Sequence, residues 1–387
     1  MSNTKKTVVG KKLKRRTFLA AAGASLVSNR LLASDKPLAA PRDGLRTLAA
    51  KKNLLYGCAV SSINLAKDKS LAAATAAEAG ILVPEFEMKR KYIETVPGAY
   101  TFEAIDEIVA FAETNNQDVR GHPLVWHSEN PTWLAAGLET ASSLPKREAL
   151  LVDYISNVIG RYAGRFHSWD VVNEAIEPRD GEKNGLRKNS IWYQNFGEDY
   201  IALSFHAAKA ADPHALLVLN DYGVEAAPIW HSNRRTAVLS LLERMKTKNV
   251  PIECLGIQGH LWPYADRFDE RVFSNFLDDV SALGLKIMIT EMDVSDKAGP
   301  SDVSQRDAFV AHATKPFLDV ALSKNATIGA LTWGLSDRYS WHSVYEKYRR
   351  TDGQISRVLP LDADMKRKPM WQSIASSFEE AEPRSPI

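Results

Sequence analysis

Short apolar runs alternate with longer amphipathic segments along most of the chain. Eight runs of strand length occur, at residues 54–61, 81–87, 118–126, 167–174, 215–223, 254–260, 286–294 and 328–334. Between them, apolar residues recur every three to four positions, as with Leu151, Ile155 and Val158, which is the period of a helix with one buried face. This alternation is typical of βαβ units and predicts an α/β fold, a single (β/α)8 TIM barrel.

The predicted barrel forms one catalytic domain, residues 41–387. A doubly wound open sheet usually has fewer units and a glycine-rich first turn, and the sequence has no GxGxxG motif. It also has no linker rich in Pro, Ser and Thr, so we expect no attached carbohydrate-binding module.

The first 40 residues differ from the rest and predict a signal peptide with its linker. Arg15 and Arg16 precede Phe18, Leu19 and a short alanine-rich apolar stretch, a pattern typical of twin-arginine export signals. The stretch is too short to span a bilayer stably. We therefore expect export to the periplasm or the extracellular medium and no membrane partner after signal removal. A basic amphipathic helix lying on a surface is the alternative interpretation.

Composition and charge narrow the classes of partner. The 387 residues include 49 Lys and Arg against 47 Asp and Glu, so the charge balance offers no argument for a nucleic-acid partner. Cys58 and Cys254 lie in apolar runs, which favours two buried thiols over a disulfide. HExxH is absent, and His122 and His127 fall on opposite faces of an extended segment, so we expect no metal and no cofactor. A monomer is the default expectation.

Polar side chains gather where the predicted strands end, which is where barrel enzymes carry their reactive groups. A single polar residue at a strand end can simply be a solvent-exposed group at the barrel rim, but here many strand ends carry one. The residues concerned are Glu87, Trp126, Asn173, Glu174, Gln258, His260, Glu291, Asp293 and Trp333.

Two of these residues, Glu174 and Glu291, predict glycoside hydrolysis. Their strands are the fourth and the seventh, which face each other across a barrel mouth, so a carboxyl separation of about 5 to 5.5 Å is feasible, as in retaining glycosidases. Such an enzyme needs one protonated carboxyl and one ionised carboxylate. We expect His260 to hydrogen-bond Glu291 and Asp293 to hold the imidazole from its other side, which keeps Glu291 charged.

Five ordered segments, GHPLVWHSENPTWL, WDVVNEAIE, IQGH, ITEMDV and LTWGLSDRYSW, resemble the signature segments of the family-10 glycoside hydrolases, chiefly endo-β-1,4-xylanases. The resemblance runs from about Leu54 to Trp371. It implies a retaining endo-xylanase acting on xylan or xylo-oligosaccharides, with Glu174 as acid/base and Glu291 as nucleophile. It also implies that the sugar chain is bound by Glu85, Lys89, His122, Trp126, Asn173, Gln258, Trp333 and Trp341.

One segment departs from that family pattern. The family commonly has Asn and Trp flanking an E-M-K core, where PEFEMKRK has Phe86 and Arg90. Phe86 cannot supply amide hydrogen bonds, so we expect an altered second glycone subsite. The alternatives are a retaining β-1,4-glucanase or a mixed xylo-oligosaccharide hydrolase on the same barrel. A non-catalytic saccharide-binding barrel is less favoured, because a pure binder has no need of the two glutamates.

Overall fold

The computed structural model describes residues 43–385; the predicted signal peptide and linker, residues 1–40, lie outside them. Every predicted apolar run has a strand; the run 118–126 also contains a short second strand, and the run 254–260 leads into another. The strands are β1 Leu55–Val60, β2 Ile81–Pro84, β3 Asp118–Gly121, β4 Val125–Trp126, β5 Ser168–Asn173, β6 Leu216–Asp221, β7 Cys254–Ile257, β8 His260–Leu261, β9 Lys286–Val294 and β10 Thr327–Thr332.

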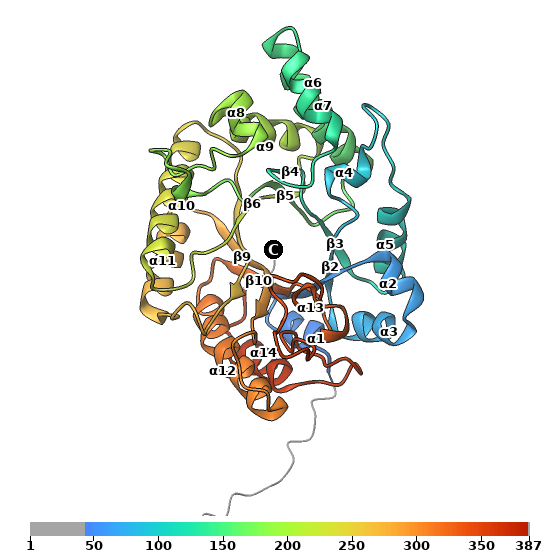
Figure 1. The fold of residues 1–387 in the computed structure, drawn as a ribbon, viewed down its shortest axis with the longest axis vertical. Helices are drawn as coiled ribbons and strands as arrows, with labels where there is room; N and C mark the ends of the chain where they lie inside the picture. The colour runs from blue at the N-terminus through green and yellow to red at the C-terminus, as the bar shows by residue number, and fades with distance from the viewer. Residues whose placement is uncertain (1–42, 386–387) are drawn as a thin grey trace, which may run out of the picture. The chain divides into compact units, whose positions relative to one another are not determined.

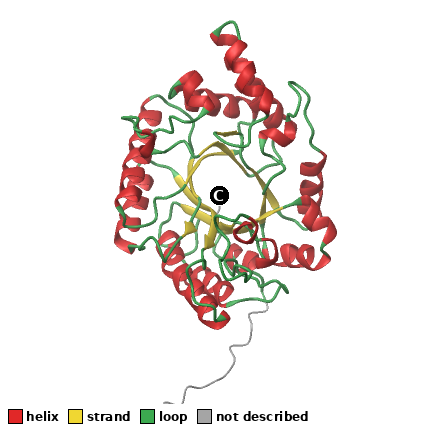
Figure 2. Ribbon diagram, in the orientation of Figure 1, coloured by secondary structure: helices red, strands yellow, loops and turns green. Residues whose placement is uncertain are grey.

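The sheet closes on itself, which confirms the predicted (β/α)8 barrel. Its strands pair in the order β1, β2, β3, β5, β6, β7, β9, β10, and β10 returns to pair with β1. All of these pairings are parallel. The two short strands lengthen the barrel wall, β4 beside β5 and β8 beside β9. Figure 2 shows the resulting ring of strands inside a ring of helices.

The helices form the outer layer (Figure 1). Their apolar stripes face the strands; α7, for example, buries Leu151, Ile155 and Val158, the residues whose spacing predicts a helix. The helices are α1 Leu45–Ala50, α2 Ser62–Lys67, α3 Lys69–Glu78, α4 Arg90–Ile93, α5 Glu103–Thr114, α6 Thr132–Thr140, α7 Leu144–Tyr162, α8 Ile191–Phe196, α9 Asp199–Ala211, α10 Ile229–Thr247, α11 Glu270–Ala282, α12 Val303–Leu322, α13 Trp341–Val344 and α14 Pro369–Glu380.

The strands divide the core in two. Along β2, Leu82 belongs to the large cluster that includes the helices, whereas Ile81 and Val83 belong to a smaller cluster built almost wholly from strand residues. This alternation places the smaller cluster inside the barrel.

Cys58 and Cys254 are buried free thiols, as the sequence predicts. Among residues 43–385, none of the helices combines the length and apolar character needed to cross a bilayer.

The buried Glu78 links three helices that are far apart in sequence. Its Oε2 accepts hydrogen bonds from the backbone N–H of Leu45, at the start of α1, and from the indole of Trp371 in α14, at 2.8 and 2.9 Å. Its Oε1 pairs with Arg367. Since Glu78 itself ends α3, one carboxylate holds the first and last described helices together.

Candidate active site

A cavity of about 920 Å³ opens at the carboxyl ends of the barrel strands. The strand-end and sugar-binding residues predicted from the sequence line it, except Glu87 and Asp293; Asp293 is fully buried and touches the lining residue His260. The lining includes Glu85, Lys89, His122, Trp126, Asn173, Glu174, Gln258, His260, Glu291, Trp333 and Trp341. Closing the barrel therefore brings together residues that are more than 200 positions apart in sequence.

Glu174 leaves the end of β5 with a left-handed backbone, φ 58°, an uncommon conformation for a residue with a side chain. Its backbone N–H donates to the carbonyl of Asn220, 2.8 Å away on β6. The carboxylate accepts a hydrogen bond on each oxygen, from the indole of Trp126 at 2.8 Å and from the amide of Gln258 at 3.0 Å. His127 Nδ1 lies 3.6 Å from the carboxylate. The side chain is thus aimed into the cleft by donors from β4 and from the segment that follows β7.

Glu291 is more deeply buried, with 4% of its surface exposed. The Asn220 amide donates to its Oε1 at 2.7 Å, and His260 Nε2 lies 3.3 Å from its Oε2. Burial acts to raise the pKa of this carboxyl, but the imidazoles of His122 and His260 and the Asn220 amide together hold the pKa below its usual value. The two glutamates consequently sit in different surroundings.

Behind His260 lies a buried aspartate shared by two imidazoles. His260 Nδ1 is 3.0 Å and His342 Nε2 is 3.1 Å from Asp293 Oδ1, and the Trp341 indole donates to Oδ2 at 2.7 Å. Burial acts to lower the pKa of His260, yet the carboxylates of Asp293 and Glu291 raise it well above its usual value. A cationic imidazole beside Glu291 favours the ionised carboxylate.

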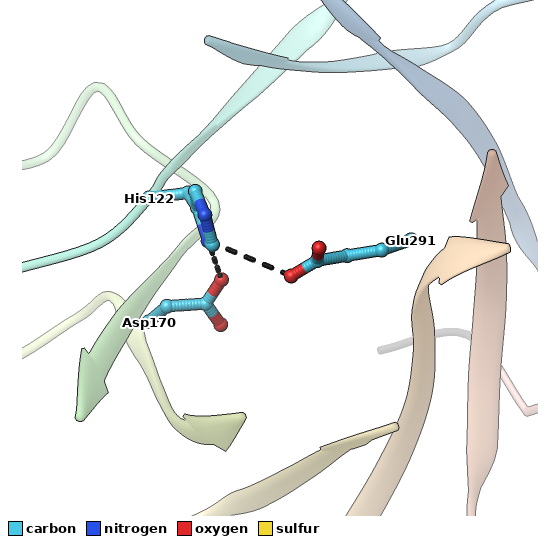
Figure 3. Close-up of side chains that lie close together, drawn as sticks. All are labelled: His122, Asp170 and Glu291. Atoms are coloured by element: carbon cyan, nitrogen blue, oxygen red, sulfur yellow. Dashed lines mark hydrogen bonds and ion pairs between the residues drawn. The ribbon is translucent and has the colours of Figure 1, made fainter. Parts of the chain in front are cut away.

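The opposite side of Glu291 faces a second imidazole and carboxylate, shown in Figure 3. His122 Nδ1 lies 2.7 Å from Asp170 Oδ2 and 3.9 Å from Glu291 Oε1. These three side chains are close enough to ligate a metal ion. However, Arg120 pairs with Asp170, and Asn220 donates to Glu291, so hydrogen bonding and ion pairing already account for the arrangement.

The residues after β2 form one wall of the cleft. Lys89 Nζ lies 4.7 Å from the Phe86 ring centroid and 5.5 Å from that of Trp126. Burial raises the pKa of Glu85 to about 8 and lowers the pKa of Lys89. Phe86 also lines the cleft, whereas Arg90 points away from it, pairing with the buried Glu94. Of the two departures from the family pattern, only Phe86 can therefore contact a ligand.

Two tryptophans from the end of β10 and from α13 line the same cleft. The ring of Trp333 stands edge-on to His122, with centroids 5.0 Å apart, and the ring of Trp341 stands edge-on to His260 at 5.3 Å. Trp333 is 8% exposed. Flat indole faces beside polar groups suit the apolar face and the hydroxyls of a pyranose.

Sequence reasoning did not identify four residues of this constellation. Asn220 contacts Glu291 and stands in an apolar run that ends in Asn-Asp-Tyr, so the strand-end rule could have found it. His127 was considered only as a metal ligand, although it faces Glu174. Asp170 and His342 carry no local signal, because their partners come from other strands and loops.

Glu87 is a strand-end residue outside the cleft lining; it accepts the N–H of Ser62 at the start of α2.

Comparison with known proteins identifies a family. Residues 44–377 match the profile described as glycosyl hydrolase family 10. Endo-1,4-beta-xylanase 5 of Pyricularia oryzae is 32% identical over 349 residues, covering 89% of this chain and 80% of the relative. The crystal structure of native xylanase 10B from Thermotoga maritima is 30% identical with a TM-score of 0.77, covering 87% of this chain and 98% of that one. Xylanase 10B from Thermotoga petrophila, in complex with xylobiose, has the same identity and TM-score and covers 87% and 97%.

Proposed function

This chain belongs to glycosyl hydrolase family 10, and from that premise we propose that it is a retaining endo-β-1,4-xylanase acting on xylan and xylo-oligosaccharides. The observation that carries the proposal is the pair Glu174 and Glu291, on two separate barrel strands in one cleft and in unlike surroundings. The substrate follows from similarity to enzymes named as xylanases.

In the first step, Glu291 attacks the anomeric carbon while Glu174 gives its proton to the departing glycosidic oxygen. The bond to the leaving sugar breaks, and a covalent glycosyl-enzyme forms on Glu291. The depressed pKa of Glu291 supports its role as the ionised nucleophile. His260, held by Asp293, orients that carboxylate and stabilises its charge.

In the second step, Glu174, now ionised, takes a proton from water, and the water oxygen displaces Glu291 from the anomeric carbon. Two displacements at one carbon retain its configuration. Asn173 and Gln258 lie beside Glu174 and are in reach of the 2-hydroxyl region of the reacting sugar. Hydrogen bonds there strengthen as positive charge develops on the ring, so they lower the barrier rather than only hold the substrate.

Substrate selection rests on the aromatic and charged walls of the cleft. His122, Trp333 and Trp341 surround the reacting sugar, and a xylose, which lacks a hydroxymethyl group, passes under an indole that would crowd a glucose. Glu85, Lys89 and Trp126 extend the glycone site.

We further propose that the enzyme is exported by the twin-arginine signal of residues 1–40 and acts as a monomer.

Product analysis by proton NMR on xylohexaose tests this proposal. The expected result is release of xylobiose or xylotriose with the β-anomer appearing first. Either substitution alone, Glu174→Gln or Glu291→Gln, should abolish this release. An α-anomer first, or activity surviving both substitutions, contradicts the assignment. Greater release of reducing sugar from carboxymethylcellulose than from xylan would instead favour a β-glucanase, and binding of xylohexaose without cleavage would favour a saccharide-binding barrel.

A further inference from the structure

Asn220, near the end of β6, contacts both of the proposed catalytic glutamates. Its backbone carbonyl accepts the N–H of Glu174 at 2.8 Å, and its side-chain amide donates to Glu291 Oε1 at 2.7 Å. Asn220 is fully buried and does not line the cleft. It therefore acts on the reaction only through the residues that it holds.

The side-chain amides of Asn220, Asn173 and Gln258 form a chain of hydrogen bonds, which we call the amide chain. Asn220 Nδ2 donates to Asn173 Oδ1 at 2.9 Å, and the Gln258 amide donates to the same oxygen at 3.4 Å. The Gln258 amide also donates to Glu174 Oε1 at 3.0 Å. The amide chain thus links the carboxylates of Glu174 and Glu291.

The amide chain works with only one orientation of the Asn220 carboxamide. Each of its bonds runs from an amide N–H to an oxygen, so the Asn220 nitrogen must face Glu291 and Asn173. A reversed carboxamide would set its oxygen against two other buried oxygens with no proton between them, which is unfavourable. What holds the oxygen end of this group therefore matters for the whole chain.

Thr290 on β9 holds that oxygen end. Its hydroxyl donates to Asn220 Oδ1 at 2.7 Å, and Thr290 is fully buried, as Asn220 is. Within the described chain, no other group donates to Oδ1. A buried carbonyl that loses its only donor is left unsatisfied, so the amide loses its fixed position.

The strand between β6 and β9 leaves room for this contact. Gly256 on β7 pairs with Asn220 in the sheet, and a Cβ at Gly256 would come within 2.3 Å of Asn220 Oδ1 and 3.0 Å of the Thr290 methyl group. Thr290 and Asn220 meet across β7 because Gly256 has no side chain. Three neighbouring barrel strands thus build the contact.

We propose that Thr290 is a positioning residue, which orients the Asn220 carboxamide and through it the nucleophile Glu291 and the amide chain. The inference rests on the proposed function. Hydrogen bonds in series strengthen one another, so the bond to Oδ1 also strengthens the N–H bonds at the other end of the amide. This support matters most in the covalent intermediate, where Glu291 carries no charge to attract the Asn220 N–H.

Thr290→Val tests the inference, because valine has nearly the same shape and lacks the hydroxyl. On xylohexaose, kcat should fall about tenfold, which corresponds to about 1.4 kcal/mol of activation free energy. KM should stay within about twofold, because Thr290 does not line the cleft. Thr290→Ser keeps the hydroxyl and should retain at least about half of the parent kcat. A Thr290→Val kcat within about twofold of the parent, or an equal loss in Thr290→Ser, overturns the inference.

Thr314→Val is the matched control. Thr314 on α12 is also fully buried, and its hydroxyl donates to the carbonyl of Val310 at 2.8 Å, outside the cleft lining. Both valine variants should lower Tm, but Thr314→Val should leave kcat within about twofold of the parent. An equal loss of kcat in Thr314→Val overturns the inference. If Thr290→Val does not fold, Thr290→Ala is compared with Thr290→Ser in the same way.

Failure of the proposed function looks different. If the parent hydrolyses carboxymethylcellulose but not xylohexaose, the xylan assignment fails, and the same comparison of kcat on that polymer decides the inference, since Thr290 acts on the catalytic pair. If the parent hydrolyses neither, the proposed function fails and the inference fails with it. An active parent with an unaffected Thr290→Val variant overturns the inference alone.

Discussion

At the scale of single residues, the proposed nucleophile depends on contacts to both of its oxygens. His260, backed by Asp293 and His342, faces one oxygen of Glu291. Asn220 and the more distant His122 face the other. Burial alone would keep such a carboxyl neutral. The Asn220 amide and the imidazoles of His122 and His260 are what allow it to be ionised.

The pKa of Glu85 predicts a stability that depends on pH. Its folded-state pKa of about 8 exceeds the usual 4.5, so its contribution to stability is fully present below pH 4.5 and is lost as pH rises through about 8. Compared with Glu85→Gln, the parent should lose up to about 1.4 kcal/mol per pH unit within this window. Urea unfolding from pH 4 to 9 measures the difference. The exposed Glu107→Gln is the control and should track the parent; equal slopes in all three proteins would contradict the prediction.

Phe86 makes the second glycone subsite different from the family pattern. It lines the cleft beside Lys89, so Phe86→Asn should restore amide hydrogen bonding and lower KM on xylotetraose at least about threefold, as expected for one added neutral hydrogen bond. Steady-state kinetics on xylobiose to xylohexaose measure this change, and kcat should change less than KM. An unchanged KM would place Phe86 outside that subsite.

At the scale of elements, close approach between neighbouring strands positions the site. Trp169 on β5 is fully buried, and its ring stacks on Phe166 with centroids 4.8 Å apart. The ring lies against Gly121 at the end of β3, where an added Cβ would come within 2.0 Å of it. A side chain at Gly121 would therefore displace the strand that leads to His122.

Gly121→Ala should accordingly destabilise the fold by about 3 kcal/mol, the upper range for overpacking a core. The matched control is Gly160→Ala in α7, where no atom apart from the neighbouring residues and the helix's own backbone lies within 4 Å of the added Cβ. That change should stabilise by up to about 1 kcal/mol, because alanine favours the helix. Chemical unfolding of both variants tests the pair, and a Gly121→Ala variant as stable as the parent would refute the close packing.

At the scale of the whole molecule, the barrel is a ring whose first and last helices must meet. Glu78 provides that junction through Leu45, Trp371 and Arg367. Closure there holds β1 against β10, and β10 leads directly into Trp333 of the cleft. Stability and the active site are linked through this contact.

Glu78→Ala should destabilise the protein by about 3 to 5 kcal/mol, because it leaves buried donors unpaired. Urea unfolding measures the loss. The exposed Glu379→Ala on α14 is the control and should stay within about 0.5 kcal/mol of the parent. A loss equally small for Glu78→Ala would show that the junction does not stabilise the ring.

The sequence by itself determined the barrel, because the two hydrophobic periods, of strand and of helix, depend only on local spacing. It also led to Glu174, His260, Glu291 and Asp293, since polar residues at the ends of apolar strands stand out in the chain. Only the tertiary structure decided the partners of these residues. Asp170, Asn220 and His342 reach the site because the ring closes, and Arg90 is turned away from the cleft toward the carbonyl of Leu150, 60 positions along the chain. Such contacts join distant segments through space, and no local pattern records them.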